Sequence, residues 1–221
     1  RTYETLRVSI LNKYGASAGL VSLVKLRQFC SHPFILDELA GGDPLIHSSK
    51  YERLVELLEE IISSDEKVII FCSFTKMADI FVNDLPRRFG IYCRHIDGRV
   101  PVEDRQPIID EFSAVRGSAA LILNPRAAGT GLNITAANHV IHYNLEWNPA
   151  IEDQASARAY RRGQERPVTV HRLYHPATIE EIINDRLSLK RDLADIAVVG
   201  NRGLPDDADD IARAIEISPL I

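Results

Sequence analysis

The sequence predicts an α/β fold: a doubly wound, mainly parallel sheet with helices on both faces, preceded by a helical N-terminal segment. Short apolar runs rich in β-branched residues alternate with helix-like segments from about residue 50 onward. These runs are continuously apolar, which is typical of strands buried on both faces of a parallel sheet. Helix start and stop signals fall between the runs, as a strand–helix alternation requires.

The expected strands are short and well separated along the chain. They are KVIIFCSF at 67–74, IYCRHID at 91–97, AALILN at 119–124, HVIHYN at 139–144 and VTVHRLY at 168–174. In an open parallel sheet, the loops at the carboxyl ends of the strands form the binding edge. The side chains that follow each run are therefore candidates for a functional site.

Helical patterns fill the intervals between the expected strands. They cover 50–62, 76–88, 103–113 and 150–162, and a last one opens at Thr178. Ser49 is expected as the N-cap of the first, with Glu52 completing a capping box, and Glu181 takes the same place after Thr178. Gly163 is expected to end the helix at 150–162.

The two ends of the chain differ from this core. Residues 1–47 are expected to form a helical segment, in which GLVSLVKLRQFC is halted at His32-Pro33. Residues 48–198 form the α/β domain. Residues 199–221, which include LPDDADDIARAIEI, are expected to be an acidic tail or a short docked helix.

Composition narrows the classes of protein. The chain has 221 residues, 45% hydrophobic and 26% charged, as expected of a soluble globular protein. No apolar run approaches the ~20 residues that span a bilayer, so no membrane association is expected. The net charge of -5 gives no overall attraction to nucleic acid, and any DNA site must therefore be local.

No metal site is expected in this chain. The three cysteines are far apart and form no Cys-x-x-Cys pair. His139 with His142, and His171 with His175, have spacings that do not converge on one ion within a strand. These histidines are interpreted as structural.

One helical face carries polar groups where apolar residues are usual. Gln154, Arg158 and Arg161 are spaced i, i+4 and i+7, so on an α-helix they form one stripe. The small residues between them offer no acidic partner at helical spacing. A surface network of ion pairs therefore does not explain the two arginines of this stripe.

A second candidate lies just after the strand at 119–124. Gly129 and Gly131 flank a threonine in a loop that begins with Arg126. Glycines allow a close approach of the backbone to a ligand, and exposed N–H groups can face phosphate oxygens.

Together these segments resemble the C-terminal RecA-like lobe of a SWI/SNF-type ATPase, a DNA translocase of helicase superfamily 2. QASARAYRRGQ resembles the family's motif VI, approximately Gln-Ala-x-Asp-Arg-x-x-Arg-x-Gly-Gln, and NPRAAGTGLNITAA resembles motif V. KVIIFCSF, HIDGRVPVEDRQPIIDEF and LRQFCSHPFIL resemble further family segments in the right order over residues 20–190. Ala157 replaces the usual acidic residue, and Asn124-Pro125 replaces the usual Ser/Thr pair of motif V.

The resemblance implies a role for each matched residue in nucleotide chemistry. Arg158 and Arg161 would be arginine fingers for the γ-phosphate of ATP, and Gln154 would position the nucleotide or the attacking water. Gly129 and Gly131 would lie with both arginines at the nucleotide. ATP and Mg²⁺ would be bound mainly by the N-terminal RecA-like lobe of the same parent chain.

The resemblance also implies double-stranded DNA as a partner. Ser73, Arg126 and Trp147 match family positions that line the track of the DNA backbone. Trp147 is equally consistent with a half-buried core aromatic. Asp97, Gly98 and Arg105 are expected to hold the fold.

The chain contains no Gly-Lys dipeptide and hence no Walker A motif, and Asp37-Glu38 lacks the strand that a Walker B pair follows. We therefore expect a fragment of a longer ATPase that is inactive alone. A non-catalytic binding scaffold and a strand-separating helicase of superfamily 2 are the alternatives. The expected compartment is the nucleus or the bacterial cytoplasm, which the sequence does not distinguish.

Overall fold

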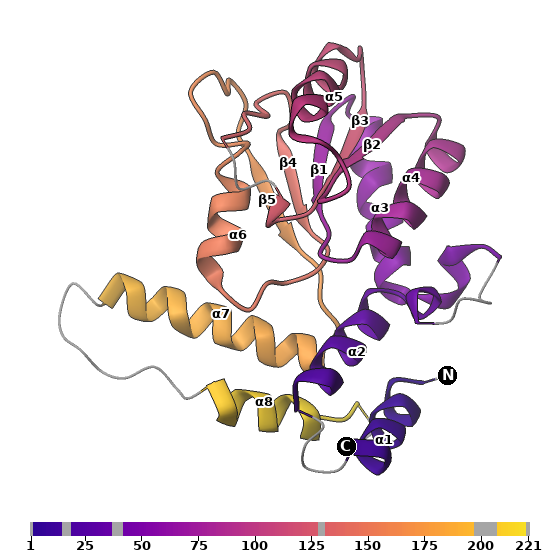
Figure 1. Ribbon diagram of the computed structural model, residues 1–221. Helices are drawn as coiled ribbons and strands as arrows, with labels where there is room; N and C mark the ends of the chain where they lie inside the picture. The colour runs from indigo at the N-terminus through magenta and orange to yellow at the C-terminus, as the bar shows by residue number, and fades with distance from the viewer. Residues whose placement is uncertain (1, 15–18, 37–41, 128–130, 197–206, 220–221) are drawn as a thin grey trace. The chain divides into compact units, whose positions relative to one another are not determined.

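The computed structural model divides the chain into two compact units (Figure 1). It describes residues 2–14, 19–36, 42–127, 131–196 and 207–219. We call Asp43–Asn144 with Ala150–Leu173 the α/β unit, and Arg1–Gly42 with Leu145–Pro149 and Tyr174–Ile221 the helical unit.

The α/β unit is built on a parallel sheet in the strand order β2-β3-β1-β4-β5. Its strands are β1 (Lys67–Phe71), β2 (Tyr92–Ile96), β3 (Ala119–Leu123), β4 (His139–His142) and β5 (Thr169–Arg172). β1 is central, and Val68 lies opposite both Ala120 of β3 and His139 of β4. Every expected strand is confirmed, and so is the doubly wound α/β fold.

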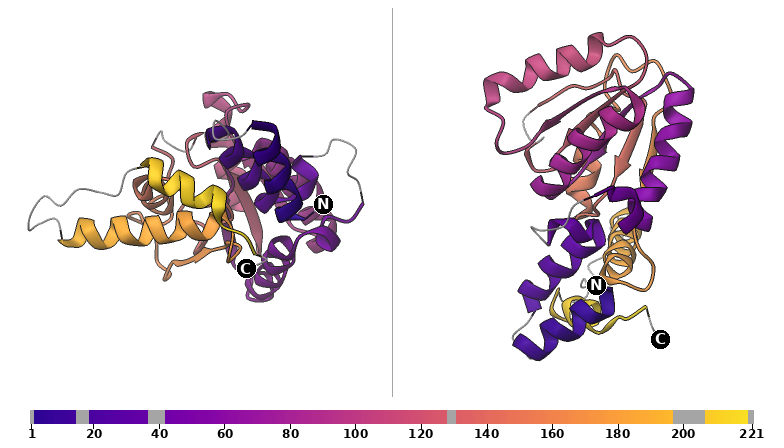
Figure 2. Two further views of the ribbon diagram at one scale, coloured as in Figure 1. Left: turned by 90° about the horizontal axis from the view of Figure 1, so that it is seen from below. Right: turned by 90° about the vertical axis from the view of Figure 1, so that its right-hand side faces the viewer.

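Helices cover both faces of this sheet (Figure 2). They are α3 (Ser49–Ser63), α4 (Thr75–Phe89), α5 (Val102–Ala114) and α6 (Pro149–Ser156), with the short helix η3 (Pro44–His47) before α3. Successive strand residues point to opposite faces. Ile69 and Phe71 join a cluster with Phe112 of α5, whereas Phe81 of α4 meets the ring of Tyr143 edge to face. All of these side chains are fully buried.

The first helix of the α/β unit begins one residue earlier than expected. Ser48, not Ser49, is the N-cap, because its backbone is extended and its Oγ accepts from the backbone N of Tyr51 at 3.3 Å. Glu52 stands at the capping-box spacing from Ser49 but not from Ser48, so the expected capping box is wrong, and the backbone conformation decides between the two serines. α4 ends at Gly90, whose φ of 66° is the left-handed conformation that glycine adopts without strain.

The helical unit contains α1 (Tyr3–Tyr14), α2 (Gly19–Ser31), η2 (Pro33–Ile35), α7 (Ile179–Ile196) and α8 (Asp207–Glu216). Its core joins Tyr3 and Leu6 of α1, Leu26 of α2 and Ile183 of α7. The hydroxyl oxygen of Tyr3 also accepts from the first backbone N–H of α7, at Ile179.

This grouping changes the expected domain boundaries. Residues 174–198 were assigned to the α/β domain, but the apolar face of α7 packs with α1 and α2 in the helical unit. The acidic C-terminal segment forms the docked helix α8, whose Ala214 is buried in the same core. Within the described residues, no helix combines the length and apolar composition that crossing a bilayer requires.

A series of polar contacts links β1, β4 and β5 near the amino end of the sheet. Glu66, just before β1, accepts from Asn138 at 2.7 Å and pairs with the imidazole Nε2 of His139. The Nδ1 of His139 lies 3.3 Å from Nε2 of His171 on β5. The sequence alone does not predict the contact between His139 and His171, because only the pairing of β4 with β5 brings them together.

The residues at the two ends of this series of contacts, Glu66 and His171, both have shifted pKa values. The hydrogen bond from His139 lowers the pKa of Glu66. Burial lowers the pKa of His171, and the neighbouring His139 adds to the effect. Groups with a lowered pKa stabilise the folded state at neutral pH and lose that contribution as the pH falls.

We expect the free energy of unfolding to fall as the pH drops below about 6.5, the unfolded value for histidine, and Glu66 to contribute only below about 4.3. His171→Gln removes the first titration, so its free energy of unfolding should fall less steeply between about pH 7 and pH 5. Urea denaturation at a series of pH values measures both slopes. Identical slopes for the wild type and the variant would contradict this account.

Candidate functional site

The turn that follows α6 carries the two arginines of the predicted stripe. α6 ends at Ser156, so the expected helix over 150–162 is wrong in its second half. The backbone N–H of Arg158 bonds to the carbonyl of Ala155, and that of Ala159 to Ser156, which are the tight i→i+3 bonds of a closing turn. The carbonyl of Arg158 accepts from Ile134 at 3.2 Å, so it is engaged outside the helix.

Arg158 is a buried arginine of this turn. Its residue is 6% exposed, and its guanidinium has no hydrogen-bond or ion-pair partner among the described residues. Its buried Nε is an unsatisfied donor. Burial lowers the pKa of Arg158, and the positive charge of Arg161 lowers it further. Buried donors in native folds are usually satisfied, so this Nε is a candidate partner for a water, an ion or a ligand.

Arg161 lies on the exposed side of the same turn. Its Nη1 lies 3.4 Å from the carbonyl oxygen of Gly131, a long hydrogen bond to the loop after β3. Gly131 has a φ of 65°, a backbone conformation that glycine adopts readily. The structure therefore brings Arg158, Arg161 and Gly131 together, although the arginines do not share a helical stripe.

Two further nucleotide candidates remain. Gln154 is exposed on α6. Gly129 lies outside the described residues.

Gln164 is a functional candidate that the sequence reasoning missed. Its Nε2 donates to the carbonyls of Ala137 at 2.8 Å, Thr135 at 3.1 Å and Ala159 at 3.3 Å. These contacts fasten the turn bearing both arginines to the segment that runs from β3 to β4. A glutamine directly after Gly163 was the available signal, because a long side-chain amide can satisfy carbonyls on both sides of a turn.

Two polar contacts fasten α6 to the sheet. The carboxylate of Glu152, which is fully buried, accepts from Nε of Arg172 on β5 at 3.2 Å. Nε2 of His142 on β4 lies 2.8 Å from Oγ of Ser156, the last residue of α6. The helix is therefore anchored immediately before the turn with the arginines.

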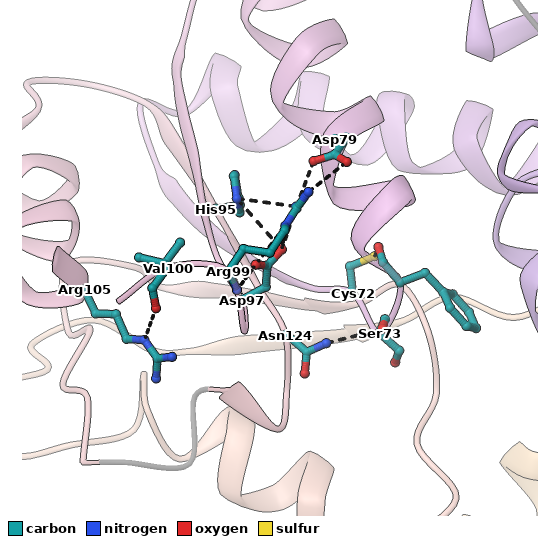
Figure 3. Close-up of polar contacts among 10 residues, drawn as sticks. Cys72, Ser73, Asp79, His95, Asp97, Arg99, Val100, Arg105 and Asn124 are labelled. Carbon is teal, nitrogen blue, oxygen red and sulfur yellow. Dashed lines mark hydrogen bonds and ion pairs between the residues drawn. The ribbon is translucent and has the colours of Figure 1, made fainter. Parts of the chain in front are cut away.

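Ser73 follows the carboxyl end of β1, near Asn124 (Figure 3), and Arg126 follows the carboxyl end of β3. Ser73 is half-buried, and Arg126 is exposed. Asn124 lies between them: its Nδ2 donates to the carbonyl of Ser73 at 3.3 Å, and its Oδ1 accepts from the backbone N of Arg126 at 3.0 Å. Both predicted DNA residues are thus held at one edge of the sheet.

Arg105 and Asp97 have the structural roles that were expected. Arg105 donates to the carbonyls of Val100 and Ala127, at 3.1 and 3.0 Å, and so holds the loop after β3. The buried carboxylate of Asp97 binds the guanidinium of Arg99, which also pairs with Asp79 at 2.8 Å (Figure 3).

Trp147 belongs to the helical unit. It is half-buried against the core of that unit, and the guanidinium carbon of Arg186 lies 4.7 Å from its ring centroid. This contact is a cation–π pair that covers one face of the ring. A contact of Trp147 with DNA stays a prediction. Among the described residues, no three His, Cys, Asp or Glu side chains converge to hold a metal ion.

Comparison with known proteins gives a consistent set of relatives. Residues 49–163 match the family model described as the helicase conserved C-terminal domain. The chain is 40% identical over 181 residues to a putative ATP-dependent helicase/translocase of Bacillus subtilis, YwqA, covering 80% of this chain. It is 34% identical over 199 residues to the human SWI/SNF-related matrix-associated actin-dependent regulator of chromatin subfamily A member 1, covering 86% of this chain. It spans 19% of the length of each.

Solved structures agree with the fold. The Sulfolobus solfataricus SWI2/SNF2 ATPase core in complex with double-stranded DNA aligns with a TM-score of 0.76 and 29% identity, over 98% of this chain and 47% of that chain. The C-terminal domain of the same ATPase aligns with a TM-score of 0.73 and 27% identity, over 98% of this chain and 92% of that domain.

We expect Arg158→Met to raise the free energy of unfolding of the chain by about 1 kcal/mol, because it replaces an unpaired buried charge with an apolar side chain of similar length. Arg158→Lys keeps the charge and should bring no such gain. Urea denaturation at neutral pH measures both. A loss of stability in the methionine variant of more than about 1 kcal/mol would mean that the guanidinium holds the fold.

Proposed function

We propose a function for this chain as a member of the helicase conserved C-terminal domain family and as the C-terminal lobe of a SWI/SNF-type ATPase of superfamily 2. It is one half of an ATP-driven motor that moves along double-stranded DNA. The parent is an ATP-dependent enzyme of the helicase-like class. The other half is the N-terminal RecA-like lobe, which supplies the Walker motifs and most contacts to ATP and Mg²⁺.

The observation that carries this proposal is the buried guanidinium of Arg158, unpaired among the described residues and beside Arg161. A buried charge without a partner costs several kcal/mol, and a fold gains nothing from keeping it. The cost is offset when an anion binds there, because a guanidinium matches the geometry of phosphate oxygens and keeps its charge. The residues present therefore fit a triphosphate.

Each residue of the turn has a distinct part in this proposal. Arg158 and Arg161 act as arginine fingers that neutralise the charge that develops during phosphoryl transfer, and ATP supplies the phosphoryl group. The contact with Gly131 orients Arg161, and Gln164 fixes the turn on which both arginines lie. Gln154 and Gly129 complete the nucleotide site.

The DNA-facing part of the proposal uses Ser73 and Arg126, with Trp147 as a third contact. A hydroxyl and an exposed guanidinium at the ends of neighbouring strands suit phosphate contacts, which position a protein on a duplex. Support comes from the similarity to the Sulfolobus ATPase core, which was solved with double-stranded DNA. We place the protein inside the cell, in a nucleus or a bacterial cytoplasm.

We expect Arg158→Ala or Arg161→Ala in the full-length parent to lower kcat for DNA-stimulated ATP hydrolysis by about 10³-fold, with little change in KM for ATP, because the fingers act in the transition state. Arg162→Ala is the matched control, since Arg162 is exposed on the same turn. Its kcat should stay within about 2-fold of the wild type.

The same assay separates the motor from a non-catalytic scaffold. A scaffold has no use for the fingers, so its parent would hydrolyse no ATP with or without Arg158. Steady-state hydrolysis by the 221-residue lobe alone, unaffected by Arg158→Ala, would contradict the proposal.

We expect the isolated lobe to bind duplex DNA weakly, with an affinity that falls steeply as salt rises. Arg126→Ala should weaken binding to all sequences alike and reduce the slope of log affinity against log salt by about 1. Fluorescence anisotropy at a series of salt concentrations measures the slope, with the exposed Arg162→Ala as control. An unchanged slope for Arg126→Ala would remove this residue from the DNA track.

A further inference from the structure

The backbone ladder of the sheet ends at the same level on both sides of β1. β1 lies between β3 and β4. On one side, the backbone N of Cys72 donates to the carbonyl of Leu123 at 2.9 Å. On the other side, the backbone N of Tyr143 donates to the carbonyl of Phe71 at 3.0 Å. Ser73 is the next residue of the central strand.

Two asparagine side chains continue the ladder by one step. Oδ1 of Asn144, which follows β4 and is buried, accepts from the backbone N of Ser73 at 3.2 Å and lies 3.5 Å from Sγ of Cys72. Nδ2 of Asn124, which follows β3, donates to the carbonyl of Ser73 at 3.3 Å (Figure 3). The backbone of Ser73 is therefore held from both neighbouring strands.

The same carboxamide of Asn124 also shapes its own loop. Its Oδ1 accepts from the backbone N of Arg126 at 3.0 Å and of Ala127 at 3.4 Å. The orientation of the amide is set by its partners, because the carbonyl of Ser73 requires a donor and the two backbone N–H groups require an acceptor. A serine or threonine, usual at this place in motif V, has a shorter side chain with one hydroxyl donor.

We propose that Asn124 and Asn144 are positioning residues that hold Ser73 and Arg126 at a fixed spacing for the DNA backbone. The inference rests on the proposed function, since Ser73 and Arg126 must contact DNA for their spacing to matter. Loops that are already ordered lose less conformational entropy on binding. Neither asparagine is among the residues that we propose to contact the nucleotide, so the pair should act on DNA affinity rather than on the chemical step.

The test uses the full-length parent and a titration of DNA-stimulated ATP hydrolysis with a 40-base-pair duplex. Asn124→Asp keeps the acceptor for Arg126 but sets an oxygen against the carbonyl of Ser73. Asn144→Asp adds the same charge at a neighbouring strand end while keeping its acceptor role. Asn83→Ala is the neutral control, because this exposed asparagine of α4 bonds only within its own helix, to the carbonyl of Asp79 at 2.8 Å.

We expect Asn124→Asp to raise the DNA concentration for half-maximal stimulation by about 5- to 10-fold, with a smaller rise for Asn144→Asp and none for Asn83→Ala. The rate of ATP hydrolysis at saturating DNA should be the same for Asn124→Asp as for the wild type. Asn124→Ala, which removes all three hydrogen bonds without adding charge, should show the same split and serves if the aspartate variant fails to fold. A fall in the saturated rate with no change in half-saturation, in whichever variant folds, would overturn the inference.

A double-mutant cycle separates positioning from general stability. Ser73→Ala should weaken DNA stimulation in the wild type and much less in the Asn124→Asp or Asn124→Ala background, because Asn124 acts through Ser73. Equal penalties in both backgrounds overturn the positioning role and leave the DNA track intact. No penalty from Ser73→Ala or Arg126→Ala in the wild type overturns the DNA track itself.

Discussion

The desolvated guanidinium of Arg158 is the constraint on which the described site depends. It is held in the fold with an unsatisfied Nε and a second positive charge nearby, an arrangement that is unfavourable by itself. Neighbouring hydrogen bonds hold the turn in place. Gln164 donates to three carbonyls, and Ser156 connects the end of α6 to β4. The turn is thus anchored on both sides of the buried charge, which suits an arrangement prepared for an anion.

One segment of chain connects the two proposed sites. Its first residues, after β3, are held by Asn124 and Arg105 at the edge proposed for DNA. Its later residues, from Gly131 onward, accept hydrogen bonds from Arg161 and Gln164 at the proposed nucleotide site. If both proposed sites are occupied as we propose, this closeness in sequence would favour coupling of hydrolysis to movement on DNA.

The sheet was predictable from the sequence because buried parallel strands leave continuous apolar runs. What the sequence could not give depended on contacts between distant residues. α6 ends at Ser156, beyond which Ile134 donates to the carbonyl of Arg158, and α7 joins the helical unit through a core shared with Tyr3. Glu66, His139 and His171 meet only through strand pairing. The arginine pair was found from spacing, although a turn rather than a helix brings the two together.

The most direct test of the account is a structure of the full-length parent with DNA and a transition-state analogue such as ADP with aluminium fluoride. The account predicts that the guanidinium groups of Arg158 and Arg161 lie within about 3 Å of the fluoride or terminal phosphate oxygens, at hydrogen-bond distance. The account is contradicted if both side chains lie far from the nucleotide and Arg158 pairs with a carboxylate of its own lobe.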